Sequence, residues 1–167
     1  MTLRRQERKG SGNRAASWAV LLLATLGASG TASAQATTER VVVNRFSGLA
    51  ISGFDPVAYF TDTAAMLGDG RFEAVQDGAV WRFRNEGNRA AFVSHPEVYG
   101  PQFGGYDPVD VARGRVVEGS PQVWAIHEQR LFLFSSDISR AAFAADPAGF
   151  VKSAQRRWPK LREGLAR

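Results

Sequence analysis

Two segments of this 167-residue chain repeat one another in the same order. The stretch from Trp81 to Tyr99 recurs from Phe132 to Phe150, and its matched positions lie 51 residues apart. Upstream, Gly53-Phe54-Asp55-Pro56-Val57 recurs as Gly105-Tyr106-Asp107-Pro108-Val109, at an offset of 52. A repeat of this kind indicates one supersecondary unit present twice. We therefore expect two copies of that unit, at about residues 48–100 and 101–152.

Each copy is predicted to contain a helical turn followed by a β-hairpin. Asp55-Pro56 and Asp107-Pro108 are typical of helix starts, because Asp accepts hydrogen bonds from free N–H groups and Pro fits the first helical position. The first hairpin is predicted over residues 71–84, around the strong turn signal Asp77-Gly78. The second is predicted over residues 123–134.

A helix should follow each hairpin and run towards Ser94 in the first copy and Ala145 in the second. The candidate capping residues are Asn85 or Asn88 for the first helix and Ser135 or Ser136 for the second. A last helix is predicted over residues 150–161. We expect it to end near Trp158-Pro159, because proline disfavours a helical conformation in the residue before it.

The predicted fold class is α+β, with both copies in one domain over residues 48–161 and a tail at 162–167. A single hairpin with one helix buries too little surface to be stable alone. The two tandem β-hairpin/helix units should therefore pack on each other with approximate two-fold symmetry.

The first 34 residues have the three parts of a secretory signal peptide. A basic stretch at 4–14 precedes an apolar run at 15–28, and Ala32-Ser33-Ala34 matches a cleavage site. The apolar run is short for a membrane span, so we expect cleavage, a linker at 35–47, no transmembrane segment in the mature protein, and a periplasmic or secreted bacterial location. An uncleaved anchor stays an alternative, and Arg4-Arg5 leaves twin-arginine export open beside the ordinary secretory route.

The positive charge of the chain belongs mostly to this leader. Removing it takes away five of 21 basic residues and one of 16 acidic ones, so the net charge falls from +5 to +1. A nucleic-acid partner is therefore not expected. The chain has no cysteine, which excludes a disulfide, a thiolate metal site and a thiol nucleophile.

Asp55 and Asp107 are the leading candidate site residues, because the repeat places them at equivalent positions. If symmetry brought them together, they could share a proton, bind a hard cation or act in acid–base chemistry. The alternative is that both only cap helices. The neighbouring Gly104-Gly105-Tyr106 could form a ligand-binding loop, since glycine allows close backbone approach, or simply connect the copies.

Other site chemistry has less support in the sequence. His95 stands at a predicted helix end and is a weak metal candidate beside Asp55 and Asp107, while His127 falls in the predicted second hairpin turn. A divalent metal with oxygen and nitrogen ligands is the possible cofactor. Motifs of the common hydrolases, phosphate-binding loops, zinc proteases and dinucleotide-binding enzymes do not occur.

The chain resembles the exported YHS domain-containing proteins of bacteria over about residues 46–161. The resemblance is carried by four stretches, which are residues 51–60, Trp81-Arg82-Phe83, residues 99–106 and Trp158-Pro159-Lys160-Leu161. It implies a small secreted domain with a treble-clef-like, metal-binding type of fold. Many exported relatives have a cysteine or selenocysteine where this chain has Asp107. The family's metal-binding cysteines match Ser135 and Ser139 here, and Arg84 and Asn88 in the first copy.

These observations favour a non-catalytic binding or accessory module of the YHS type. Its partner would be a protein or a small molecule, bound near Asp55, Tyr106, Asp107, Gly104 and Gly105. One alternative is a metal protein that uses oxygen and nitrogen ligands in place of the family's cysteines. A second alternative is an enzyme in which the two aspartates act as acid and base.

Overall fold

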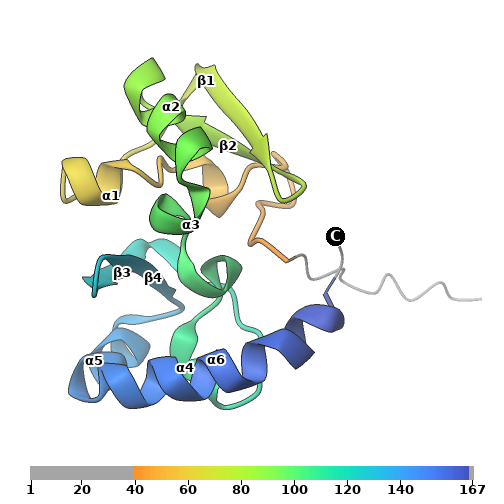
Figure 1. The fold of residues 1–167 in the computed structure, drawn as a ribbon, viewed down its shortest axis with the longest axis vertical. Coiled ribbons are helices and arrows are strands. Elements are labelled where there is room, and N and C mark those ends of the chain that lie inside the picture. The colour runs from red at the N-terminus through yellow and green to blue at the C-terminus, as the bar shows by residue number, and fades with distance from the viewer. Residues whose placement is uncertain (1–39, 166–167) are drawn as a thin grey trace, which may run out of the picture. The chain divides into compact units, whose positions relative to one another are not determined.

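A computed structural model describes residues 40–165 (Figure 1). The chain divides into two units, residues 1–34 and 35–167, and only the second falls within the described residues. The predicted leader and its cleavage site lie outside them. Between residues 40 and 165, no helix has both the length and the apolar character that crossing a membrane requires.

The first half of the described chain contains one hairpin and several short helices. The 3-10 helix η1 precedes the hairpin with α1, and α2 and α3 follow it. Their bounds are η1 (Ile51–Gly53), α1 (Ala58–Thr61), β1 (Asp69–Gln76), β2 (Ala79–Phe83), α2 (Glu86–Ser94) and α3 (Pro96–Tyr99).

The second half contains the same kinds of element in the same order. They are η2 (Gln102–Gly105), α4 (Pro108–Ala112), β3 (Ser120–His127), β4 (Arg130–Phe134), α5 (Asp137–Ala145) and α6 (Pro147–Glu163). Strands β3 and β4 begin 51 residues after β1 and β2. Helices α5 and α6 likewise begin 51 residues after α2 and α3. The fold class is thus mixed α+β with two small antiparallel sheets, β1–β2 and β3–β4.

Both hairpins lie where the sequence predicts them, although β1 and β3 start earlier than expected. Each has an irregularity in its first strand, between Asp69 and Glu73 in β1 and between Ser120 and Trp124 in β3. The first turn is made by Asp77-Gly78, with φ of 52° and 80°. Two positive φ values in succession are the signature of a type I′ turn, which Asp-Gly favours.

Asn85 caps α2 and Ser136 caps α5, so each half uses one of its two candidate capping residues. The predicted end of the last helix is wrong, because α6 continues through Pro159 to Glu163. A proline inside a helix has no N–H to donate to the carbonyl group four residues earlier. Pro159 is exposed, so this carbonyl group lies close to solvent. Trp158 and Leu161 pack against the second core cluster and hold the final turn in place.

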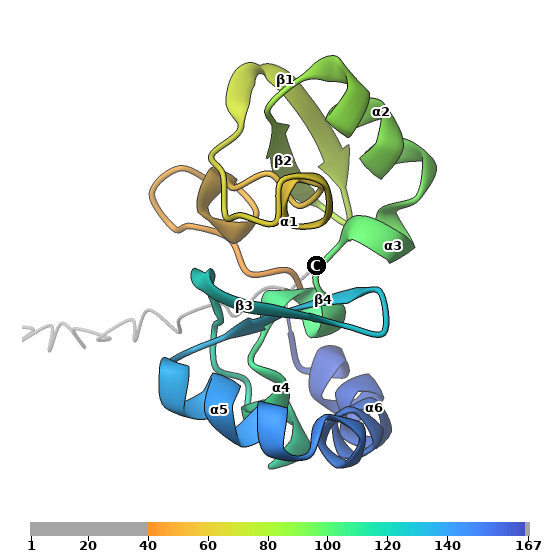
Figure 2. The ribbon, with the colours of Figure 1, turned by 90° about the vertical axis from the view of Figure 1, so that its left-hand side faces the viewer.

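The hydrophobic core has two clusters, and strand β4 contributes to both. Leu131 and Leu133 belong to the first cluster, with Trp81, Phe83 and Phe92. The alternate residues Phe132 and Phe134 belong to the second, with Phe143. Side chains alternate across a strand, so both faces of β4 are buried. In Figure 2 the β3–β4 hairpin lies between the first half and the layer of α4, α5 and α6.

The packed part of the chain begins before the expected boundary at residue 48. Val41 and Val42 are buried, and the Val42 amide donates a hydrogen bond to the Gly104 carbonyl at 2.8 Å. The segment passes so close to η2 that a Cβ atom on Gly104 would meet the Arg40 carbonyl oxygen at 2.0 Å. The residues expected to form a linker therefore include part of the core, and Gly104 is needed for close packing.

Candidate functional site

Asp107 is fully buried and accepts four hydrogen bonds. As the N-cap of α4 it receives the Val109 amide at 2.9 Å. The amide and hydroxyl of Ser135 both donate to Oδ2, and the Ser139 hydroxyl donates to Oδ1, each at 2.8 Å. One carboxylate thus joins the start of α4 to the end of β4 and the first turn of α5.

Asp55 has the corresponding place in the first half and is also fully buried. Its Oδ1 accepts from the amides of Val57 and Ala58 at 2.8 and 3.4 Å. Its Oδ2 accepts from the Arg84 amide at 2.8 Å and from Asn88 Nδ2 at 2.6 Å. The carboxylate therefore joins the turn before α1 to the end of β2 and the first turn of α2.

These contacts leave the aspartates little capacity for the active roles considered for them, which are proton sharing, cation binding and acid–base chemistry. A carboxylate has about four lone-pair sites, and each of these accepts four hydrogen bonds from the protein. The partners of Asp55 lie at residues 57–88 and those of Asp107 at residues 109–139, so the two carboxylates serve different halves. Each carboxylate is engaged by its own half of the domain. Asp107 is the N-cap of α4, as the capping alternative predicts, whereas the N-cap of α1 is Val57 and Asp55 binds the amides of the turn before that helix.

The remaining loop candidates pack inside the protein. Tyr106 is 1 % exposed, and its ring lies against Trp158 with centroids 5.9 Å apart. Gly105 is also buried, and a Cβ atom there would contact Val42 and Ile51 at 3.5 Å. Gly104 alone of the three lines the cleft described below. The stretch serves mainly as a packed connection between the halves.

The two histidines lie apart from the aspartates. His95 stands between α2 and α3 with an exposed side chain, and its Nδ1 is 3.5 Å from a carboxylate oxygen of Glu97. His127 ends β3, and its ring packs edge-on against Phe143. Across residues 40–165, no three acidic or histidine side chains come close enough to hold a metal ion together.

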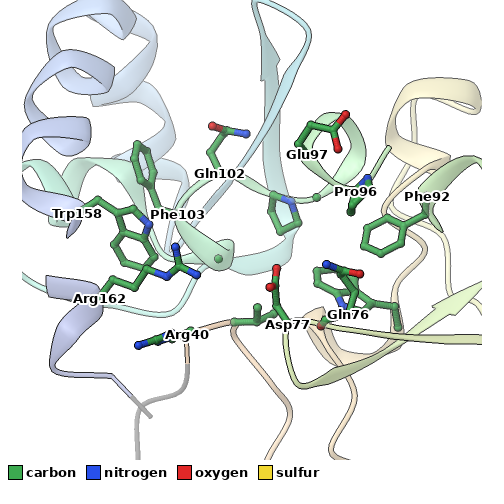
Figure 3. A pocket seen from close by; sticks show the side chains of 15 residues that line it. Arg40, Gln76, Asp77, Phe92, Pro96, Glu97, Gln102, Phe103, Trp158 and Arg162 are labelled. Carbon is green, nitrogen blue, oxygen red and sulfur yellow. Dashed lines mark hydrogen bonds between the residues drawn. The ribbon is translucent and has the colours of Figure 1, made fainter. Parts of the chain in front are cut away.

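A cleft of about 360 Å³ opens where the two halves meet (Figure 3). Its size lies at the lower end of the range for small-ligand sites. Aromatic and proline rings from both halves form much of its lining, namely Trp81, Phe92, Pro96, Pro101, Phe103 and Trp158. The sequence segments that meet here are the start of the described chain, the β1–β2 turn, α3, η2 and α6.

Charged side chains of both signs also line this cleft. In Figure 3 the Arg162 guanidinium and the Asp77 carboxylate point into it from opposite sides, and Arg40 is also among the lining residues. None of the ion pairs formed within residues 40–165 includes Asp77, Arg40 or Arg162. The buried Nε of Arg40 has no hydrogen-bond partner among the described residues. Opposite charges thus line one cleft without neutralising each other.

Protein-family models, curated proteins and solved structures gave no match to this chain. The function has to be argued from the geometry of its own residues.

The sequence alone does not assign the charged residues of the cleft, or Trp158, to a binding site. Asp77 was interpreted only as a turn residue, Arg40 fell within the expected linker, and Arg162 within the expected tail. Trp158 was placed at the end of a helix that in fact continues. The available signal was in the last helix, where Trp158 and Arg162 are four residues apart and therefore share one face.

Proposed function

We propose that this protein is an exported, non-catalytic binding module of the YHS type, and that its ligand is a small molecule bound in the cleft between the halves. The observation that carries the proposal is the cleft itself, where aromatic side chains surround unpaired Asp77 and Arg162. Ligand sites combine an apolar lining with a few polar groups that orient the ligand. This position replaces the one first expected at Asp55, Tyr106 and Asp107, because those residues are buried and engaged with the protein.

We further propose that the two halves are copies of one ancestral unit related by approximate two-fold symmetry. The repeated order of elements and the irregularity at the same point of both first strands support this. The two buried aspartates add a chemical argument, because each links a turn, a strand end and a helix start in the same way. Such a duplication naturally leaves a cleft at the junction of the copies.

The resemblance to YHS proteins draws support from Ser135 and Ser139. These residues match the positions of the family's metal-binding cysteines, and both hydroxyls converge on Asp107 at 2.8 Å. Two cysteines at these positions would also converge on one point. In this chain a carboxylate lies at that point, so the proposed function does not depend on a metal.

The experiment is a ligand screen on the purified protein and two matched variants. Gln76→Trp places a large side chain in the cleft while its backbone carbonyl can still accept the bond from Trp81 Nε1. Val75→Trp, one residue earlier, puts the same side chain on the opposite, 73 % exposed face of β1. Thermal shift against a library of small metabolites, followed by NMR titration of the hits, measures binding.

We expect ligands of the wild-type protein to bind Val75→Trp and to lose affinity for Gln76→Trp. Hits that bind all three proteins equally would place the site elsewhere. Hits recovered chemically unchanged after long incubation with the protein agree with a non-catalytic role, and turnover would contradict it. A mass beginning at Gln35 for protein isolated from the periplasm tests the proposed export.

A further inference from the structure

The unpaired charges in the cleft indicate what kind of ligand it accepts. Asp77 and Arg162 face the same space from opposite sides but do not form an ion pair. Several other acids of the described chain do pair with an arginine, for example Asp69 with Arg71 at 2.7 Å and Asp62 with Arg84 at 3.0 Å. The two charges that face the cleft are thus not neutralised by an ion pair and are available to a ligand.

The fold itself keeps them separate. Asp77 is the first residue of the type I′ turn between β1 and β2, whose backbone geometry is fixed by the pairing of Gln76 with Ala79. Arg162 belongs to the last turn of α6, which is fixed through the contacts of Trp158 with Phe103 and Tyr106. The two elements belong to different halves, and the cleft lies between them.

The cationic side of the cleft has a second member. Arg40 lines the cleft as Arg162 does, and its buried Nε lacks a hydrogen-bond partner among the described residues. Buried polar groups in proteins nearly always have a partner. An anionic ligand group on this side would meet two guanidinium groups, which are well suited to carboxylates because their N–H donors form a planar fork.

The space between the charges is apolar. Phe92 and Pro96 contribute from the side of Asp77, and Phe103 and Trp158 from the side of Arg162. A complementary ligand has an apolar side chain for this lining, an anionic group for the arginines and a cationic group for Asp77. A ligand with only one charge would make a direct charged contact on only one of the two sides.

We propose that the cleft binds a small zwitterion with an apolar side chain, of the class of free amino acids and dipeptides. This inference rests on the proposed binding function and adds the chemical class of the ligand. Arg162, assisted by Arg40, receives the carboxylate, and Asp77 receives the ammonium group. The aromatic and proline rings contact the apolar side chain.

The test compares four probes by NMR titration at low ionic strength. Phenylalanine carries both charges, 3-phenylpropionate only the anion, and phenethylamine only the cation, while the apolar ring is the same in all three. Alanyl-phenylalanine keeps both charges at a greater separation. We expect phenylalanine or the dipeptide to bind about ten-fold more tightly than either singly charged probe, since a charged hydrogen bond contributes about 1.5–3 kcal/mol. The tighter of the two distinguishes amino acids from dipeptides.

Two variants assign the charges separately. Asp77→Asn removes the acid but keeps a sequence, Asn-Gly, that is at least as favourable for the type I′ turn. It should abolish the advantage of phenylalanine over 3-phenylpropionate. Arg162→Gln should abolish the advantage of phenylalanine over phenethylamine. The control variants Asp137→Asn and Arg156→Gln, at exposed positions outside the cleft, should change neither ratio.

Equal affinities for phenylalanine and the two singly charged probes, or no binding of any of the four at millimolar concentration, would overturn the inference. The proposed function has its own readout. If Gln76→Trp abolishes binding of an uncharged or singly charged metabolite, the cleft is a binding site and only the ligand class is wrong. If no ligand responds to Gln76→Trp, the proposed function fails as well.

Discussion

At the scale of single residues, the buried aspartates are structural centres of each half. Asp107 accepts four hydrogen bonds, from the start of α4, from Ser135 after β4 and from the first turn of α5. An apolar side chain in its place would leave those donors buried and unpaired, which costs about 1–3 kcal/mol for each group that finds no new partner.

We predict that Asp107→Ala lowers the free energy of unfolding by about 3–5 kcal/mol, measured by urea denaturation. If this variant does not fold, Ser139→Ala provides a milder test, because it removes one hydrogen bond to Asp107 and should cost about 1 kcal/mol. Ser153→Ala is the control, since that hydroxyl contacts only the exposed Arg156. A loss for Ser139→Ala no larger than for Ser153→Ala would contradict the proposed role of Asp107.

The sequence predicted the capping role of Asp107 and the local bond of Asp55, but not the full set of partners of either aspartate. Asp-Pro is a local signal, and the bonds to Val57 and Val109 follow from it. The bonds to Asn88 and Ser139 span 33 and 32 residues. Contacts over that distance depend on how the hairpin folds back, which no local pattern specifies.

At the scale of elements, the two hairpin turns share a backbone conformation with two successive positive φ angles but use different residue types. Asp77-Gly78 forms a left-handed turn easily, because glycine has no Cβ. Glu128 and Gln129 occupy the same place in the second hairpin with φ of 47° and 56°. For residues other than glycine this conformation is strained by roughly 1–2 kcal/mol each.

We predict that replacing Glu128-Gln129 by Asn-Gly stabilises the protein by about 1 kcal/mol and raises its melting temperature by a few degrees. Differential scanning calorimetry measures both. The reciprocal change, Gly78→Gln, should lower the melting temperature, because it adds strain at a φ of 80°. An unchanged or lower melting temperature for the Asn-Gly variant would mean that strain in the turn is relieved in another way.

In the second strand of each hairpin, the pattern of apolar residues in the sequence matches the burial seen in the structure. In β2 the buried residues Ala79, Trp81 and Phe83 alternate with partly exposed ones, as expected for a strand with one covered face. In β4 the run Leu131-Phe132-Leu133-Phe134 is apolar throughout, and all four residues are buried. A continuous apolar run indicates burial on both faces, so the asymmetry between the hairpins was present in the sequence.

At the scale of the whole described domain, the halves depend on each other. Leu131 and Leu133 complete the core of the first half, although they belong to the second. The Tyr59 hydroxyl also donates to the Pro121 carbonyl at 2.8 Å, which joins the halves directly. Burial, and to a smaller extent the nearby Asp55, raises the pKa of Tyr59 well above its usual range, so this donor stays protonated.

We predict that both halves unfold in one transition. The indole N–H signals of Trp81 and Trp158 report on the two core clusters by NMR, and they should disappear at the same urea concentration. Leu133→Ala should lower both midpoints together, with a loss of about 2–5 kcal/mol. Val75→Ala, on an exposed face, should move neither. Separate midpoints for the two signals would show that the halves are independent.

The cleft could not be predicted from the sequence because it is a property of this mutual packing. Asp77 and Arg162 are 85 positions apart and lie on elements that meet only in the complete domain. The repeat predicted two units and their contents, but it does not specify the surface through which they join.

The burial of β4 on both faces also has a consequence in time. Synthesis proceeds from the N-terminus, so residues 41–92 of the first core are made well before Leu131 and Leu133, which complete it. At ordinary elongation rates, the roughly forty residues in between take on the order of seconds to add. During that interval the first half is an incomplete nascent chain with exposed apolar side chains, available to a chaperone or to an export channel that accepts unfolded chains.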